Sequence, residues 1–156
     1  MKKAFYILGG AVLIYLVMGI NKAFAKPTKT GSVRNSDAFG CGCFGASRGN
    51  REHNGLDFLA KPNEQIFSPI SGKVTRFPFP YGDDLRWKGI EIKNSEYSIK
   101  IFYVNATVNI GQEVKKGDFI ATAQNIASKY GTGMQNHIHF EVRDKNNNII
   151  DPTNLF

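Results

Sequence analysis

The three histidines of the chain lie in two short motifs, and together with one aspartate they could bind a metal ion. His53 lies four residues before Asp57, and His137 lies two residues before His139. Two imidazole nitrogens and one carboxylate oxygen suit a catalytic zinc site, in which water takes the fourth position. Residues i and i+2 of a β-strand point to one face, so His137 and His139 can reach the same cleft. One can bind the metal while the other accepts a proton from water.

The two motifs resemble those of the lysostaphin/LytM-type zinc peptidases, which cut peptide cross-links in bacterial cell walls. The resemblance covers residues 38–156 and rests on HNGLD at 53–57, GQEVKKGD at 111–118, HIHFEV at 137–142 and DPT at 151–153. It implies one zinc ion bound by His53, Asp57 and His139, with His137 as the general base. It also implies a mostly-β fold, a single antiparallel β-sheet domain with the zinc site in a cleft.

One position departs from the family pattern. The family has a further histidine in a Tyr-x-His-Leu stretch, where it helps to stabilise the transition state, and the aligned residues 103–106 read Tyr-Val-Asn-Ala. Asn105 is therefore expected to donate the hydrogen bond to the developing oxyanion. A neutral amide is a poorer donor than the imidazolium of the family histidine. Because complete loss of one such donor typically slows a reaction ~100–1000-fold, slow hydrolysis is expected. Glu141, on the same strand face as the histidine pair, is expected to orient an imidazole.

Two other functional classes compete with an endopeptidase. The run 40–51, GCGCFGASRGNR, is similar to the chemotaxin-2 type of this fold, which keeps the zinc site and lacks the activity. A zinc-containing binding module is therefore the alternative. A biotinyl- or lipoyl-type carrier also contains a hairpin like 111–118, but it needs a displayed lysine in its own turn motif, which is missing here. That class also leaves the histidines unexplained.

Size and charge restrict the possible partners. A chain of 156 residues has room for one domain with a modest core. The net charge of +7 fits either an ordinary basic surface or attraction to a polyanion such as teichoic acid or anionic lipid. Nucleic acid is not expected, because no dense Lys/Arg stripe with interleaved aromatic residues is present. Cys41 and Cys43 lie one residue apart, and free thiols, a local bridge and a metal-binding pair all remain open.

The N-terminal segment indicates export. Residues 4–20 carry no charge, follow Lys2 and Lys3, and precede the small-x-small sequence Ala23-Phe24-Ala25. We expect a membrane-spanning or signal helix in residues 1–25, a linker at 26–37 and the peptidase-like domain at 38–156. The domain is then outside the cytoplasm, anchored in a cell envelope or a membrane-containing phage particle, or secreted after cleavage at Ala25. Expected partners are peptidoglycan peptides, the membrane through residues 4–20, and other envelope or virion proteins.

Hydrophobic alternation predicts short strands that position the motifs. Isoleucines at 90, 92, 99 and 101 show the period of two of half-buried strands joined by a turn at 94–96. The aromatic and proline-containing stretch 77–82 could line a peptide groove or form a hydrophobic cluster under a loop. One helical turn is expected at 125–130. Strands are expected at 55–60, 64–68, 73–77, 88–93, 97–105, 112–114, 119–124 and 137–143.

Overall fold

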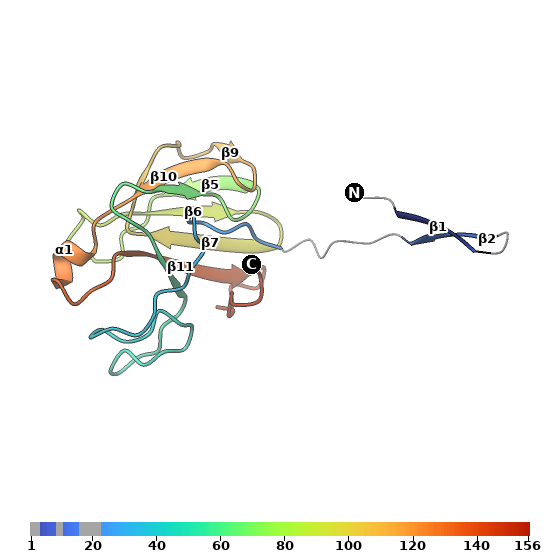
Figure 1. The fold of residues 1–156 in the computed structure, drawn as a ribbon. Coiled ribbons are helices and arrows are strands. Elements are labelled where there is room, and N and C mark those ends of the chain that lie inside the picture. Colours follow the sequence, from blue (N-terminus) through green and yellow to red (C-terminus); the bar gives the residue numbers. More distant parts are fainter. Residues whose placement is uncertain (1–3, 9–10, 16–22) are drawn as a thin grey trace.

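The computed structural model describes residues 4–8, 11–15 and 23–156, and β-strands dominate this part of the chain (Figure 1). A four-residue helix, α1 (Ala127–Tyr130), lies within the predicted helical turn. From residue 56 onward, every strand overlaps a predicted one. The strands are β1 (Ala4–Leu8), β2 (Ala11–Tyr15), β3 (Leu56–Leu59), β4 (Gln65–Phe67), β5 (Gly72–Arg76), β6 (Gly89–Lys93), β7 (Tyr97–Phe102), β8 (Val104–Ala106), β9 (Glu113–Val114), β10 (Phe119–Ala123) and β11 (His137–Asp144).

The domain contains two antiparallel sheets where the sequence predicted one. The larger has the order β3-β11-β7-β6-β5-β9, and the smaller has the order β4-β10-β8. The central strands β11, β7 and β6 of the larger sheet lie side by side in Figure 1. The prediction of a single sheet was wrong because the strand predicted at 97–105 divides at Tyr103. That residue has a φ of 66°, in the left-handed region that few non-glycine residues adopt. Phe102 therefore ends β7 in the larger sheet, and Val104 begins β8 in the smaller one.

The larger sheet has one face in the core and one face turned away from it. The core face carries alternate residues of its central strands, all with 0% exposure: Ile90, Ile92, Ile99, Ile101, Ile138, Phe140 and Val142. They form one hydrophobic core with residues of the smaller sheet, such as Ile66 and Ile120. The residues between them point to the opposite face, where His139 pairs with Phe102 and Glu141 pairs with Lys100. This alternation turns the second histidine motif away from the core.

In the described part of the segment 4–20, two strands take the place of the predicted helix. Residues 4–8 and 11–15 pair as the antiparallel strands β1 and β2, while 9–10 and 16–22 lie outside the described residues. Periodicity alone cannot separate a helix from two strands in a continuous apolar run. A Gly-Gly pair at 9–10 between two β-branched and aromatic segments is also a hairpin signal. In the described ranges, no helix is both long and apolar enough to cross a membrane.

The segment predicted as a linker, 26–37, contacts the domain. Its backbone forms hydrogen bonds with β3 and β4, including Arg34 N to Asp57 O at 2.7 Å and Phe67 N to Pro27 O at 2.9 Å. Just before it, Phe24 is 3% exposed, and its ring packs edge-on against Phe140 and two other aromatic residues. Residues 24–37 therefore cover part of the sheet that carries the two histidine motifs.

A buried carboxylate stabilises the polar face of the larger sheet. Glu91 is 2% exposed and lies 2.7 Å from Arg76 Nη2 and 2.9 Å from Lys93 Nζ, and the Thr75 hydroxyl donates to it at 2.9 Å. Burial acts to raise the pKa of Glu91, but the hydrogen bonds from Arg76, Lys93 and Thr75 outweigh it and lower the pKa to about 2. The ionised form is therefore the one that the folded protein stabilises.

We expect Glu91→Gln to lower the free energy of unfolding at pH 7 by about 1–2 kcal/mol, because it removes charge-assisted hydrogen bonds to a buried group. The folded-state pKa lies below the unfolded value, so this stabilisation is present above about pH 4.5. It should be lost as the pH falls toward 2. Urea titrations between pH 2 and pH 7 measure it, with Glu96→Gln on the exposed 94–96 turn as the matched control. The assignment is contradicted if Glu91→Gln and wild type have the same free energy of unfolding at pH 7. It is also contradicted if the difference between them is as large at pH 2 as at pH 7.

Candidate metal centre

The pairing of β3 with β11 brings the two histidine motifs together. Asp57 lies directly opposite His139 in the antiparallel ladder, and His53 comes from the loop that leads into β3. Gly55 allows this loop to approach β11, because a Cβ at that position would collide with the carbonyl group of Phe140. A glycine within the first motif is therefore a steric requirement of the site.

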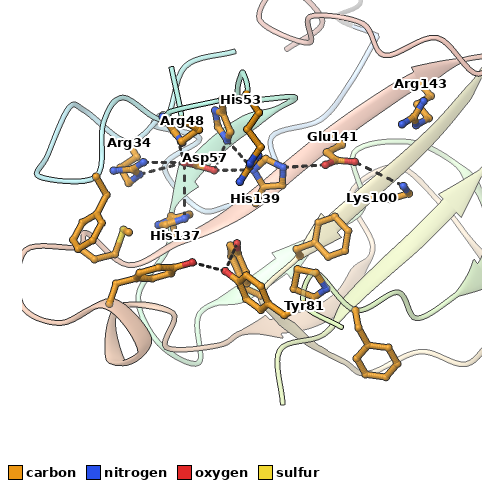
Figure 2. Close-up of a pocket in the computed structure, with 18 residues that line it drawn as sticks. Arg34, Arg48, His53, Asp57, Tyr81, Lys100, His137, His139, Glu141 and Arg143 are labelled. Carbon is orange, nitrogen blue, oxygen red and sulfur yellow. Dashed lines mark hydrogen bonds and ion pairs between the residues drawn. The ribbon is translucent and has the colours of Figure 1, made fainter. Parts of the chain in front are cut away.

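Three potential ligand atoms converge at this junction (Figure 2). His53 Nε2 lies 3.0 Å from Asp57 Oδ1 and 2.9 Å from His139 Nδ1. His139 Nδ1 in turn lies 2.9 Å from Asp57 Oδ1. In the described part of the chain, these three residues form the one group of histidine, cysteine and acidic side chains placed to share a metal ion. His53 and Asp57 are buried, at 4% and 3% exposure, and His139 is partly buried.

The other nitrogen of each imidazole is held by an acceptor. His53 Nδ1 lies 2.8 Å from the Cys43 carbonyl, and His139 Nε2 lies 3.2 Å from Glu141 Oε1. Because these oxygens accept, the held nitrogens carry the proton in the neutral form of each imidazole, and in that form His53 Nε2 and His139 Nδ1 have lone pairs toward Asp57. Partners of this kind commonly fix the tautomer of metal-binding histidines. Glu141 thus lies where the sequence predicted an orienting residue.

This donor set fits a zinc ion. Two neutral nitrogens and a carboxylate are a usual catalytic zinc set, and a tetrahedral ion with ~2.0–2.1 Å bonds separates its ligands by about 3.3 Å. The observed separations of 2.9–3.0 Å are close to that value. Lone pairs that converge this closely repel one another unless a proton or a cation lies between them. The side chains therefore meet the requirements of a zinc site with one open position.

Two arginines that the sequence analysis did not single out hold the far oxygen of Asp57. Arg34 donates to Asp57 Oδ2 from Nη2 at 3.0 Å and from Nε at 3.3 Å, and Arg48 Nη2 lies 3.4 Å away. Arg34 is 2% exposed and also pairs with Asp37. Asp57 can therefore offer only Oδ1 to a metal. No local pattern marks Arg34, since it reaches Asp57 from 23 residues away.

The charges of the site shift its titrations. For the protein alone, burial acts to raise the pKa of Asp57, but hydrogen bonds with His139 and His53 outweigh it and lower the pKa well below its usual range. Burial acts to lower the pKa of His139, whereas its hydrogen bonds with Asp57 and Glu141 raise it to about 9. Burial lowers the pKa of His137, and the charge of Asp57 opposes this only in part. His137 is thus neutral at pH 7.

His137 is placed as a base beside the convergent ligands. Its Nδ1 lies 2.7 Å from the Gln135 carbonyl, which can only accept, so Nδ1 carries the proton and Nε2 has a free lone pair. Nε2 lies 3.9 Å from Asp57 Oδ2 (Figure 2). A neutral imidazole with its lone pair free can take a proton from water in the cleft.

The site opens into a cleft of about 700 Å³ with an aromatic wall. Tyr103 lies edge-on to His137, with 5.6 Å between ring centroids. The hydroxyl of Tyr81 lies 3.0 Å from that of Tyr103 and 2.7 Å from that of Tyr130. Burial, against the opposing hydrogen bond from Tyr81, raises the pKa of Tyr103 to about 12, so the phenol remains a donor at neutral pH. Phe79, Pro80 and Tyr81 also line the cleft, so part of the stretch 77–82 forms its wall.

The structure does not bring Asn105 to this site. Its side chain accepts a hydrogen bond from Gln124 at 3.1 Å and lines a separate depression with Arg86 and Trp87. The bend at Tyr103 explains the difference, because it moves the chain into the smaller sheet and interrupts the alternation. Phe102 and Tyr103 consequently both line the cleft, and Asn105 does not. The side chain of Asn105 therefore does not lie where a donor to an oxyanion in this cleft is expected.

The loop before β3 is closed by a disulfide between Cys41 and Cys43. Of the alternatives left open by the sequence, the structure therefore contains the local bridge. Neither cysteine belongs to the group that could hold a metal. The contribution of this loop to the site comes through the Cys43 carbonyl, which holds His53, and through Arg48.

Comparisons with known proteins agree with this geometry. Residues 51–152 match the model of Peptidase family M23. Leukocyte cell-derived chemotaxin-2 of Bos taurus is 31% identical over 122 residues, which cover 78% of this chain and 77% of that protein.

Solved structures show the same fold. A zinc containing peptidase from Vibrio cholerae matches with a TM-score of 0.58 and 29% identity. The match covers 83% of this chain but only 39% of the Vibrio cholerae chain. The structure of LytU matches with a TM-score of 0.54 and 25% identity over 92% of this chain and 88% of that one. The matched region contains both histidine motifs, and the chain belongs to Peptidase family M23, whose members are zinc-dependent.

Proposed function

We propose that the domain is a zinc-dependent endopeptidase that hydrolyses peptide cross-links of bacterial cell-wall peptidoglycan. The observation that carries this proposal is the convergence of His53, Asp57 and His139 within 3.0 Å, in an open cleft beside the free nitrogen of His137. Family membership supports peptidase chemistry in general. The wall-peptide substrate is the part that needs direct testing.

The chain supplies the groups that hydrolysis requires. A zinc ion bound by His53, Asp57 and His139 would polarise a peptide carbonyl and lower the pKa of water. His137 Nε2 accepts the proton of the attacking water and later delivers it to the leaving amine. The pair of Arg34 with Asp57, and that of Glu141 with His139, keep two of the ligands in orientation.

Tyr103 replaces Asn105 in this proposal as the donor to the developing oxyanion. One consistent direction of the hydroxyl chain has Tyr130 donating to Tyr81 and Tyr81 donating to Tyr103. The Tyr103 hydroxyl hydrogen is then free to point into the cleft. A phenol donor in this position supports transition-state stabilisation without the family histidine.

The alternative is a zinc-containing binding module. It is favoured by the relation to chemotaxin-2 and by the absence of a histidine at the position aligned with the family's Tyr-x-His-Leu stretch. Such a module would retain the metal and bind wall fragments without cleaving them.

We expect one zinc per chain in protein purified without a histidine tag, and its loss in Asp57→Ala and His139→Ala. Arg34→Met should retain zinc with about 10–100-fold weaker affinity, because Asp57 loses the partner that orients its carboxylate. Plasma emission spectrometry measures the stoichiometry, and competition with a chromogenic chelator measures the affinity. Lys145→Met, a similar charge loss on an exposed turn, is the control. Stoichiometric zinc in both ligand variants would show that the ligand assignment is wrong.

A muropeptide digest tests the activity. We expect cleavage by wild type, a loss of about 10²–10⁴-fold in His137→Ala, which lacks the base, and a loss of about 10²–10³-fold in Tyr103→Phe. Asn105→Ala should stay within about twofold of wild type, because its side chain lies outside the cleft. Tyr130→Phe controls for loss of one hydroxyl from the chain of three.

Two outcomes of the digest decide between the candidates. A large loss in Asn105→Ala with full activity in Tyr103→Phe restores the donor implied by the family resemblance. If zinc-loaded wild type cleaves no cross-link but binds wall fragments, the result supports the binding module and contradicts the endopeptidase assignment.

The proposal places the domain outside the cytoplasm with its N-terminal segment retained as an anchor, in a cell envelope or in the membrane of a phage particle. The uncharged run 4–20 supports the membrane association. Cleavage after Ala25 would remove Phe24, whose ring is 3% exposed in the core. Such a loss of a large buried side chain typically costs ~3–5 kcal/mol.

We therefore expect an intact Ala25–Lys26 bond in the native protein, which mass spectrometry of protein extracted from its natural membrane can detect. A mature species that starts at Lys26 would contradict the anchor and support a removed signal.

A further inference from the structure

The cleft continues past the metal centre along β11. His139, Glu141 and Arg143 alternate on the face away from the core, and Lys100 of β7 lies directly opposite Glu141. Lys100, Glu141 and Arg143 all line the cleft. Figure 2 shows these three residues together on one side of His139, away from Arg34 and Arg48.

Positive charge dominates this end of the cleft. Glu141 is already engaged, with Oε1 at 3.2 Å from His139 Nε2 and Oε2 at 3.8 Å from Lys100 Nζ. Arg143 donates from Nη1 to the Asn147 carbonyl at 2.8 Å, which anchors the side chain and leaves most of its N–H groups available. On its other side Lys100 lies opposite Glu91 of β6, whose carboxylate is already paired with Arg76 and Lys93. The carboxylates on both sides of Lys100 are therefore in use, and the residue opposite Arg143 is the uncharged Ser98.

The neighbouring strands extend this imbalance. Across the ladder from Arg143 come Ser98 of β7, Lys93 of β6 and Lys73 of β5, before Glu113 ends the row on β9. Lys93 and Lys73 stand directly opposite each other, and like charges in that relation destabilise a sheet. Lys93 is paired with Glu91, but the row still holds three cations against the one acid Glu113, so the potential at the Arg143 end of the cleft is positive.

We infer that Lys100 and Arg143 form a subsite for a carboxylate of the peptide substrate. This rests on the proposed function, because it assigns the cleft an extended peptide. Arg143 is four residues beyond His139 on β11, a distance of about 13 Å at ~3.3 Å per residue. An extended substrate has nearly the same rise, so the recognised acid lies three to four residues from the scissile bond.

A single placed carboxylate fits this surface better than a polyanion does. Glu141 lies between His139 and Arg143 and would repel a negative group at the intermediate position. On the far side of the metal centre, Arg34 and Arg48 are engaged with Asp57. The order of charges along the floor therefore selects an uncharged residue followed by an acidic one.

The test uses a series of fluorescent alanine/glycine decapeptides, each with one glutamate at a different position. The control, or twin, of each peptide carries glutamine at the same position. Binding is measured by anisotropy on zinc-loaded, full-length His137→Ala protein, which does not turn the peptide over. We expect about tenfold tighter binding of the glutamate peptide than of its twin at the best position, from a charge-assisted hydrogen bond. The preference should fall to about twofold or less in Arg143→Gln and Lys100→Gln.

Lys145→Gln, with the same charge change outside the cleft, should keep the full preference. Equal binding of the twins, or equal losses in Lys145→Gln and Arg143→Gln, overturns the subsite. A preference that ignores the glutamate position and is abolished by dextran sulfate shows a general polyanion surface and also overturns it.

The two proposals fail separately. Wild type that cleaves glutamate and glutamine peptides with the same kcat/KM leaves the endopeptidase standing and removes the subsite. Position-dependent binding without any cleavage by wild type keeps the subsite and removes the endopeptidase.

Discussion

The site depends on one buried carboxylate whose two oxygens have different partners. Asp57 Oδ1 faces His53 and His139, while Oδ2 is held by Arg34 and Arg48. Burial of a carboxylate is costly unless it is paired and hydrogen bonded. Guanidinium groups offset that cost at Oδ2, and Oδ1 is left to two imidazoles that are placed to share a cation with it. The loop around residues 40–53, the start of β3 and the segment near Arg34 all meet at this group.

The larger sheet makes this arrangement possible because its two faces have different tasks. Its core face is a continuous layer of buried isoleucine, valine and phenylalanine side chains. Its other face presents charged and aromatic side chains in cross-strand rows, first His139 with Phe102 and then Glu141 with Lys100. Strand alternation therefore orders the chemistry by distance, and each step of two residues along β11 adds about 7 Å from the metal centre.

The bend at Tyr103 shows how one backbone conformation changes the composition of an active-site cleft. Regular alternation would place Tyr103 and Asn105 on one face, and the family pattern makes the second of these the catalytic position. The positive φ of Tyr103 instead sends the following strand into the other sheet. Strained positions of this kind often occur at functional sites, where the surrounding structure compensates for them. Here the ring of Tyr103 packs against His137 and Trp87, and its hydroxyl reaches Tyr81.

The sequence by itself determined the features that arise from local periodicity and from residue chemistry. Hydrophobic alternation located the strands from β3 to β11, and the paired histidine motifs predicted the group of side chains that converges in the structure. Glu141 followed from the same period of two. Tertiary structure decided what that period cannot encode: the division of β3 to β11 into two sheets, the position of Asn105 outside the cleft, and the approach of Arg34 to Asp57 from 23 residues away. It also decided that residues 4–8 and 11–15 pair as strands, since a helix and a hairpin bury similar apolar residues. Local patterns record which face a side chain points to, whereas its partner depends on how distant segments pack.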